Sequence, residues 1–266
     1  MFLRRLLITL WLRQISNGGW RVDKNSNKYI ILFATLVCVV CSVLLTFFAV
    51  SLKDRQEQNR SIDRKKNIIK AFGFREELAK ITDVAGIESF YKERIREMVI
   101  DTDGKIIDDK TPDMLDPDKD TGLLPVYVVV EGGEFISLAI PVSGKGLWST
   151  IYGYLALEKD LNTVLGITFY EHGETPGLGG EVEMPWFQNN FVGKKILDDA
   201  GRLVSIKVVK GKVDETYSDP DKKRHAVDGI SGATMTSKGV TTFLEHDLKK
   251  YLPFLTKVRE EGLEIK

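Results

Sequence analysis

Small residues and hydroxyl side chains crowd one short stretch of the chain, DGISGATMTS, which covers residues 228–237. A helical pattern begins directly after it, so the unpaired N–H groups of a helix start lie here and favour an anion such as phosphate. Gly229 and Gly232 let the backbone approach such a group closely. A helix capped by one hydroxyl explains the stretch, taken alone, slightly better. Its hydroxyls, as caps, phosphate contacts or an attachment point, are Ser231, Thr234, Thr236 and Ser237.

Two other glycine-rich loops carry aromatic and acidic side chains. They are SGKGLW at residues 143–148 and HGETPGLGGE at residues 172–181. Trp148 suits contact with a planar ring, although core packing explains it too. His172 and Glu174 suit acid–base chemistry or a metal, but no nucleophile accompanies them. We therefore assign no catalytic residue and no metal ligand, and the absence of phosphate-loop and dinucleotide fingerprints argues against those sites.

Alternating apolar residues predict the sheet that must position these loops. Strands are expected on both sides of a turn at Gly132–Gly133, with a hairpin around Asp103–Gly104. Helical spacing predicts helices near both ends of this region. The fold expected is α+β, a mainly antiparallel sheet with flanking helices. Further strands are expected at 150–157, 163–170 and 203–209, and helices at 88–98 and 240–252.

An uncharged run of 24 residues, Tyr29–Leu52, precedes this domain. As a helix it would reach roughly 36 Å, enough to cross a bilayer core with some tilt. A charged helical stalk should follow, with an apolar stripe at Ile62, Ile68, Ile69 and Phe72. The domain plan is a basic segment at 1–28, a membrane helix at 29–52, a connector at 53–85 and a cofactor domain at 86–266.

Charge and cysteine usage narrow the choice of partners. Acidic and basic residues balance at 38 each, which argues against a nucleic-acid partner. Lysine and arginine flank both ends of the apolar run, so charge alone does not orient it; a single N-terminal span favours an exported domain. Cys38 and Cys41 lie within the run. They suit apolar packing, or a cluster completed by another subunit.

Four motifs in this order resemble one family. GLWSTIYGY (146–154), HGETPGLGGE (172–181), DGISGATMTS (228–237) and PFLTKVREEGL (253–263) are similar to the C subunit of the bacterial Na⁺-translocating NADH:quinone oxidoreductase. The resemblance covers about residues 29–266. It implies FMN joined by a phosphoester bond to Thr234, with Thr236 a weaker rival. It also implies a flavin transferase that uses FAD and reads Asp228.

The same resemblance implies an electron relay in a multi-subunit complex of the bacterial inner membrane, with one span and a periplasmic flavin domain. Sodium would move through other subunits. Related alternatives are the G subunit of an Rnf complex and a flavin-free, membrane-anchored binding or assembly protein. The residues expected at the flavin site are Gly146, Leu147, Trp148, Glu174, Thr175, Gly177, Leu178, Asp228, Ser231, Gly232, Ala233, Thr234, Thr236 and Lys238.

Overall fold

The computed structural model describes residues 27–116 and 119–263, so most of the basic segment expected at 1–28 lies outside the described residues. The chain divides into two compact units, Met1–Asn59 and Arg60–Lys266. The described part of the first unit belongs to helix α2 (Asn27–Ala71). The second unit contains the sheet and the three glycine-rich loops.

The first unit carries the apolar run that the sequence assigns to a membrane. Its residues from 30 to 52 are all exposed. A window of this helix has a mean hydropathy of 2.8, and within residues 27–116 and 119–263 no other helix is long and apolar enough to cross a bilayer. Exposed apolar surface of this extent needs a covering of lipid or protein. The expected N-terminal apolar helix is therefore present as a candidate membrane anchor.

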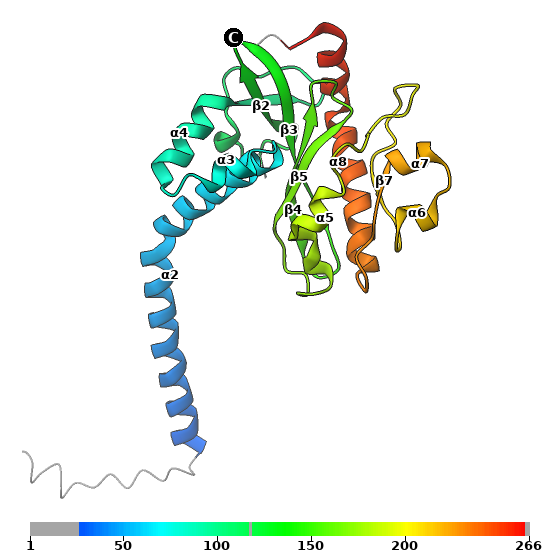
Figure 1. Ribbon diagram of the computed structural model, residues 1–266. Helices are drawn as coiled ribbons and strands as arrows, with labels where there is room; N and C mark the ends of the chain where they lie inside the picture. Colours follow the sequence, from blue (N-terminus) through cyan, green and yellow to red (C-terminus); the bar gives the residue numbers. More distant parts are fainter. Residues whose placement is uncertain (1–26, 117–118, 264–266) are drawn as a thin grey trace, which may run out of the picture. The chain divides into compact units, whose positions relative to one another are not determined.

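A five-stranded antiparallel sheet forms the centre of the second unit (Figure 1). Its strands follow chain order because each pairs with the next. Between the second and third strands, Gly132 and Gly133 have φ values of 61° and 84°, as a tight hairpin turn requires. The strands are β1 (Ile95–Asp101), β2 (Leu123–Glu131), β3 (Glu134–Lys145), β4 (Thr150–Glu158) and β5 (Val164–Glu171).

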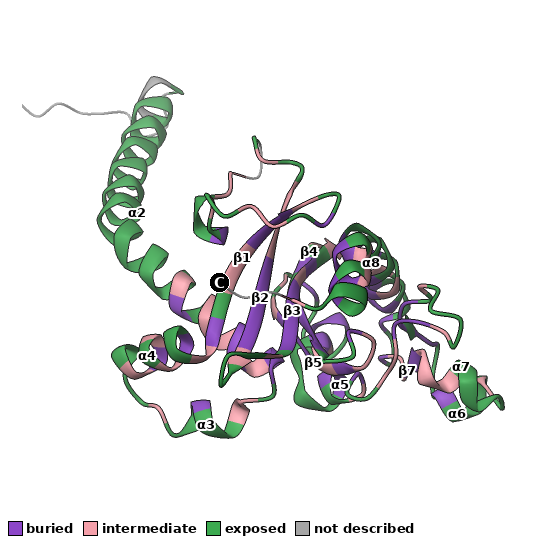
Figure 2. Cartoon of the chain, turned by 90° about the horizontal axis from the view of Figure 1, so that it is seen from above, coloured by how far each residue is buried: buried purple, intermediate pink, exposed green. Residues whose placement is uncertain are grey.

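The two faces of the sheet pack into two separate cores. On β3, Leu138 and Ile140 enter the first core, whereas Ala139 between them enters the second. This follows from the two-residue period of a strand. Helix α8 (Thr234–Glu261) supplies the first core, and the end of α2 with α4 (Val84–Arg94) supplies the second. Figure 2 shows the buried strands between these helices.

Helix α8 approaches β3 very closely. The apolar stripe expected on this helix is buried, including Val240 and Leu248. Asp247 is buried on the same stripe, where it accepts a 2.8 Å hydrogen bond from the N–H of Ser143. A Cβ added at Gly239 would lie 2.3 Å from the backbone oxygen of Lys145. The close contact places the start of α8 against the loop after β3.

Two expected elements differ from the structure. The helix expected at 88–98 begins earlier, because Asp83 caps α4 by accepting from the N–H of Gly86, and it ends at Arg94, where β1 pairs with β2. The strand expected at 203–209 is reduced to β6 (Lys207–Val208), which pairs in parallel with β7 (Ala226–Val227). Ser205 has a φ of 60°, which interrupts the extended backbone before it.

The hairpin expected around Asp103–Gly104 forms as a turn with one bridge, Ile100 to Ile106. The remaining short helices lie between the main elements. They are α3 (Arg75–Ala79), η1 (Pro112–Met114), η2 (Gly179–Glu183), α5 (Pro185–Asn189), α6 (Val213–Thr216) and α7 (Pro220–Arg224).

Replacing Gly239 by alanine should destabilise the domain. A glycine-to-alanine change inside a helix ordinarily gains about 1 kcal/mol. Here the added methyl group meets a backbone oxygen at 2.3 Å, so the sign reverses and we expect a loss of about 1–3 kcal/mol. The thermal midpoint of the full chain in detergent measures this. Thr242→Ala, at an exposed position of the same helix, is the control. An unchanged or raised midpoint for Gly239→Ala would contradict the close contact.

Candidate functional site

One carboxylate joins the three glycine-rich loops. Glu174, which is 5% exposed, lies in the loop after β5. Its Oε1 accepts from the N–H groups of Trp148 and Ser149 at 2.8 and 3.2 Å. Its Oε2 accepts from the N–H of Leu147 at 3.1 Å and from the hydroxyl of Thr236 at 2.6 Å. The loop after β3 and the first turn of α8 are therefore both tied to Glu174.

The same contacts hold Glu174 ionised. Burial by itself raises the pKa of a carboxyl group, but the hydrogen bonds from Thr236 and three backbone N–H groups outweigh it and lower the pKa of Glu174. A charged acceptor surrounded by donors is among the stronger hydrogen-bonding arrangements in proteins. The expected acid–base partner His172 instead accepts from the N–H of Glu174 at 3.3 Å and faces Glu183 at 3.5 Å.

Several glycines of the motifs make room for this junction. A Cβ on Gly146 would lie 2.7 Å from Oε1 of Glu174, and one on Gly179 would lie 2.5 Å from the hydroxyl oxygen of Thr236. Gly232 has a φ of 72° and would meet Leu178 at 2.8 Å. Gly146 and Gly179 therefore allow close approach between loops, whereas close approach to a ligand was expected at Gly229 and Gly232.

The stretch DGISGATMTS (228–237), called the attachment motif here for the bond expected at Thr234, contains two threonines with different surroundings. Thr234 is the first residue of α8 and is exposed. Thr236 is 1% exposed and donates its hydroxyl hydrogen to Glu174. The N-cap of α8 is Ala233, and no side chain caps the helix. The expectation that Ser231, Thr236 or Ser237 caps this helix is therefore wrong, and its first N–H groups keep their capacity to bind an anion.

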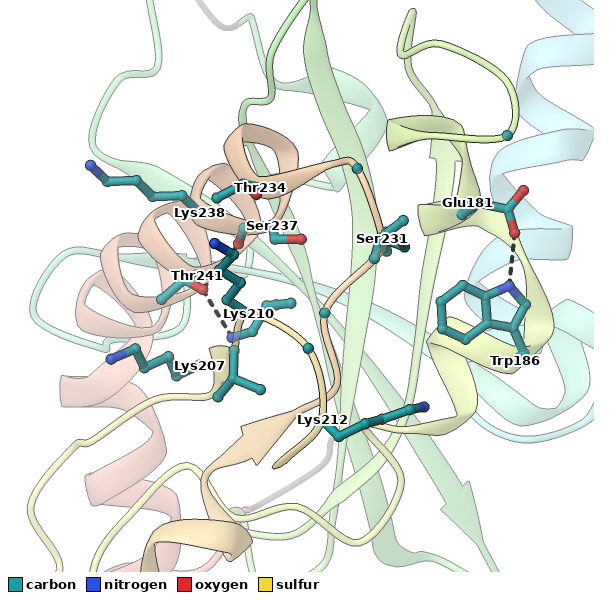
Figure 3. Close-up of a pocket in the computed structure, with 17 residues that line it drawn as sticks. Glu181, Trp186, Lys207, Lys210, Lys212, Ser231, Thr234, Ser237, Lys238 and Thr241 are labelled. Atoms are coloured by element: carbon teal, nitrogen blue, oxygen red, sulfur yellow. Dashed lines mark hydrogen bonds between the residues drawn. The ribbon is translucent and has the colours of Figure 1, made fainter. Parts of the chain in front are cut away.

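A cavity of about 840 Å³ opens beside Thr234 (Figure 3). Ser237 lies in its wall, 5% exposed, with a hydroxyl oxygen that has no hydrogen-bond partner among the described residues. Such a buried polar atom calls for a ligand or water. The lining residues are Gly177, Glu181, Trp186, Lys207, Val208, Val209, Lys210, Gly211, Lys212, Gly229, Ile230, Ser231, Gly232, Thr234, Ser237, Lys238 and Thr241.

The structure brings together part of the expected site. Gly177, Ser231, Gly232, Thr234 and Lys238 line the cavity. Two expected ring contacts are exposed apolar side chains outside this lining: Trp148 at 69% and Leu178 at 44% exposure. The other expected residues, which hold the loops or flank them, are Gly146, Leu147, Glu174, Thr175, Asp228, Ala233 and Thr236.

Asp228 lies outside the cavity lining but contacts one of its residues, Lys212. Its carboxylate accepts from the ammonium group of Lys212 and from the N–H of Val213, both at 2.8 Å. Burial would raise the pKa of Asp228, but these partners lower it. The N–H of Gly229 donates to the oxygen of Gly211 at 2.8 Å. The segment 207–212 is thereby fastened to the attachment motif.

Sequence reasoning missed this lysine-bearing wall. Lys207 lies in the strand expected at 203–209, and Lys210 and Lys212 follow that strand. The close spacing of these lysines was the only sequence signal for this wall. Their place beside the motif depends on the pairing of β6 with β7, and β7 begins at Ala226, 18 residues after β6 ends at Val208. Trp186, an aromatic residue close to the second loop, also lines the cavity, and its indole N–H donates to Glu181 at 2.8 Å. Neither residue was assigned to the expected site.

Comparisons with known proteins converge on one family. Residues 146–249 match the model of the FMN-binding domain, and they contain the second and third glycine-rich loops in full and the last three residues of the first. The C subunit of the Na⁺-translocating NADH-quinone reductase from Pseudomonas aeruginosa is 38% identical, covering 90% of this chain and 98% of that protein. Its counterpart from Vibrio anguillarum is 37% identical, with coverage of 91% and 98%. The chain belongs to the family of these C subunits.

Solved structures of this family share the fold. The protein from Parabacteroides distasonis superimposes with a TM-score of 0.65 at 32% identity, covering 77% of this chain and 97% of that chain. NqrC from Shewanella oneidensis gives a TM-score of 0.60 at 29% identity, with coverage of 74% and 96%. The α+β fold class expected from the sequence is therefore confirmed.

Replacing Glu174 by glutamine should cost about 2–4 kcal/mol of unfolding free energy, because it removes charge-assisted hydrogen bonds and turns an amide donor toward other donors. Tryptophan fluorescence of the full chain in detergent, with increasing denaturant, measures this. Glu171→Gln, at an exposed carboxylate three residues away, should stay within about 0.5 kcal/mol of the wild type.

The unfolding free energy lost in Glu174→Gln should depend on pH. The pKa of Glu174 is lower in the folded chain than its unfolded value, near 4.5. Such a carboxyl group stabilises the folded chain fully at a pH above its unfolded pKa, and this stabilisation is lost as the pH falls through its folded pKa. The difference between wild type and Glu174→Gln should therefore shrink from about pH 6 to about pH 3. A difference that grows toward low pH would mean that Glu174 is protonated in the folded chain.

Proposed function

We propose that this chain is the FMN-carrying subunit of a Na⁺-translocating NADH-quinone reductase, with the FMN phosphate esterified to the hydroxyl of Thr234. The observation that carries the proposal is the exposed position of Thr234 at the uncapped start of α8, on the wall of the cavity. Thr236 is buried and engaged with Glu174, so it is poorly placed to accept a phosphate. The FMN-binding domain match and the names of the relatives support the cofactor and the complex.

The groups around Thr234 fit a phosphate ester. Once esterified, the phosphate carries about one negative charge at neutral pH. Unpaired N–H groups at the start of α8 favour that charge. The hydroxyl of Ser237 supplies a donor whose hydrogen no described residue accepts, and Lys238 supplies a cation on the same wall. Each of these groups binds an anion without any rearrangement of the fold.

Apolar side chains near Thr234 fit the flavin ring. Val208 and Ile230 line the cavity, together with Trp186. Trp148 and Leu178 offer exposed apolar surface on the neighbouring loops. A planar cofactor is usually held by such surfaces plus a few polar groups, in sites of about 300–1,000 Å³. Bound FMN supplies the redox chemistry, and the residues of the chain hold and orient it.

In this proposal the apolar run 29–52 anchors the chain in the bacterial inner membrane. Residues 53–85 connect this anchor to residues 86–266, which carry the flavin on the periplasmic side. Other subunits deliver electrons and pass them toward quinone. Sodium moves through those subunits, because the run 29–52 contains no charged residue. A flavin transferase would make the bond to Thr234. If it reads the side chain of Asp228, the pair with Lys212 must open first.

Replacing Thr234 by alanine should abolish covalent flavin. The wild-type chain, made with a flavin transferase, should give a fluorescent band on a denaturing gel, and the peptide holding Thr234 should gain the mass of one FMN residue. Thr236→Val is the matched control, because it removes the rival hydroxyl at similar volume and should keep the fluorescent band. Ser231→Ala should keep it too.

Loss of the label in Thr236→Val with retention in Thr234→Ala would move the attachment to Thr236. A colourless wild-type chain would favour a flavin-free anchored protein. An Rnf G subunit would give the same gel as the proposed flavoprotein, so the proteins that copurify with the chain distinguish these two complexes.

A further inference from the structure

Three lysines that line the cavity have no acidic partner. Lys207 and Lys210 come from β6 and the turn after it, and Lys238 comes from α8. All three are exposed, and none forms an ion pair with any described residue. Lys212 differs because it pairs with Asp228. The one acidic residue in the described lining, Glu181, accepts from the indole N–H of Trp186.

The fold fixes Lys210 opposite the start of α8. Next to it, the N–H of Val208 donates to the hydroxyl of Thr241 on α8 at 3.0 Å. On its other side, the oxygen of Gly211 accepts from Gly229 of the attachment motif. Figure 3 shows Lys210 reaching toward Ser237 and the start of α8, whereas Lys207 and Lys212 point to other sides of the opening.

A second, independent observation points to a ligand here. Ser237 lies in the first turn of α8, is 5% exposed, and has a hydroxyl without a hydrogen-bond partner in the described chain. A buried hydroxyl rarely stays unpaired in a folded protein. It lines the same cavity as Lys210 and Lys238. Two cations and one unsatisfied donor are the groups that a phosphate monoester needs, since it carries nearly two negative charges at neutral pH.

We propose that Lys210, Lys238 and the hydroxyl of Ser237 form a non-covalent seat for a phosphate monoester, which binds a flavin nucleotide independently of the bond to Thr234. The identity of the nucleotide rests on the proposed function, whereas the phosphate chemistry rests on the cavity alone. Lys210 lies outside the attachment motif, on a segment fastened to it by Asp228 and Gly229. The seat holds the phosphate of a bound flavin nucleotide in the cavity that Thr234 also lines.

The test uses the full chain in detergent with Thr234→Ala, so that no covalent bond can form. FMN and riboflavin are titrated separately, and quenching of flavin fluorescence reports binding. FMN should bind at least about tenfold more tightly than riboflavin, which lacks the phosphate. Inorganic phosphate should compete with FMN and leave riboflavin binding unchanged. If ribose 5-phosphate displaces FMN with an affinity similar to that of FMN itself, the seat binds phosphate esters in general, which still supports the phosphate chemistry.

Single substitutions in the Thr234→Ala background locate the seat. Lys210→Gln should weaken FMN binding about three- to tenfold, with less effect at high salt, and Lys210→Arg should largely restore it. Ser237→Ala should weaken FMN binding about tenfold. None of these should alter riboflavin binding. Lys222→Gln, at an exposed lysine of α7, is the matched charge control and should leave FMN binding within about twofold.

Equal binding of FMN and riboflavin overturns the proposal, as does a loss in Lys222→Gln equal to that in Lys210→Gln. Thermal midpoints within about 2 °C of the parent show that a variant has kept its fold. A Ser237→Ala chain that unfolds is replaced by Ser237→Thr, which keeps the hydroxyl and should keep FMN binding. Phosphate-dependent binding in Thr234→Ala, with no flavin mass on the wild type, would refute covalent attachment and leave this seat standing.

Discussion

The candidate site depends on one buried negative charge. The carboxylate of Glu174 accepts four hydrogen bonds, three from backbone N–H groups of the loop after β3 and one from Thr236 at the start of α8. Without it, three N–H groups and a hydroxyl would compete for water in a buried junction. Glu174 therefore holds the loop after β3 and the start of α8 together, and this role explains its place in the motif HGETPGLGGE.

Much of the scaffold follows from the sequence because its signals are local. The strands β2 to β5, the turn at Gly132–Gly133 and the buried stripe of α8 depend on alternation or spacing within a few residues. The membrane run 29–52 depends only on composition. The helix expected at 88–98 was misplaced because the cap at Asp83 and the pairing of β1 with β2 decide its ends, and that pairing joins distant residues.

The sequence predicted the residues of the candidate site that lie in or next to its motifs, but it did not predict the opposite wall, which carries Lys210. Thr234 belongs to the motif DGISGATMTS and Lys238 follows it directly, so their place on the cavity was foreseeable. Lys210 faces them because β6 pairs with β7 and because Gly229 bonds to Gly211. Asp228 was expected to be read by another protein, yet its carboxylate also holds Lys212 and the start of α6. Such roles depend on tertiary pairing, which local patterns do not encode.

The order of the junction residues in the chain determines when Thr234 reaches its place at the start of α8. Glu174 and Thr236 are 62 residues apart, and α8 follows every strand of the sheet. During synthesis, Glu174 emerges long before the helix that supplies its fourth donor. Thr234 therefore reaches its position at the start of the folded helix α8 only when the nearly finished domain has formed the contacts around Glu174. A modifying enzyme that required the closed junction would label completed domains and pass over truncated ones, so the flavin itself would mark molecules that had folded.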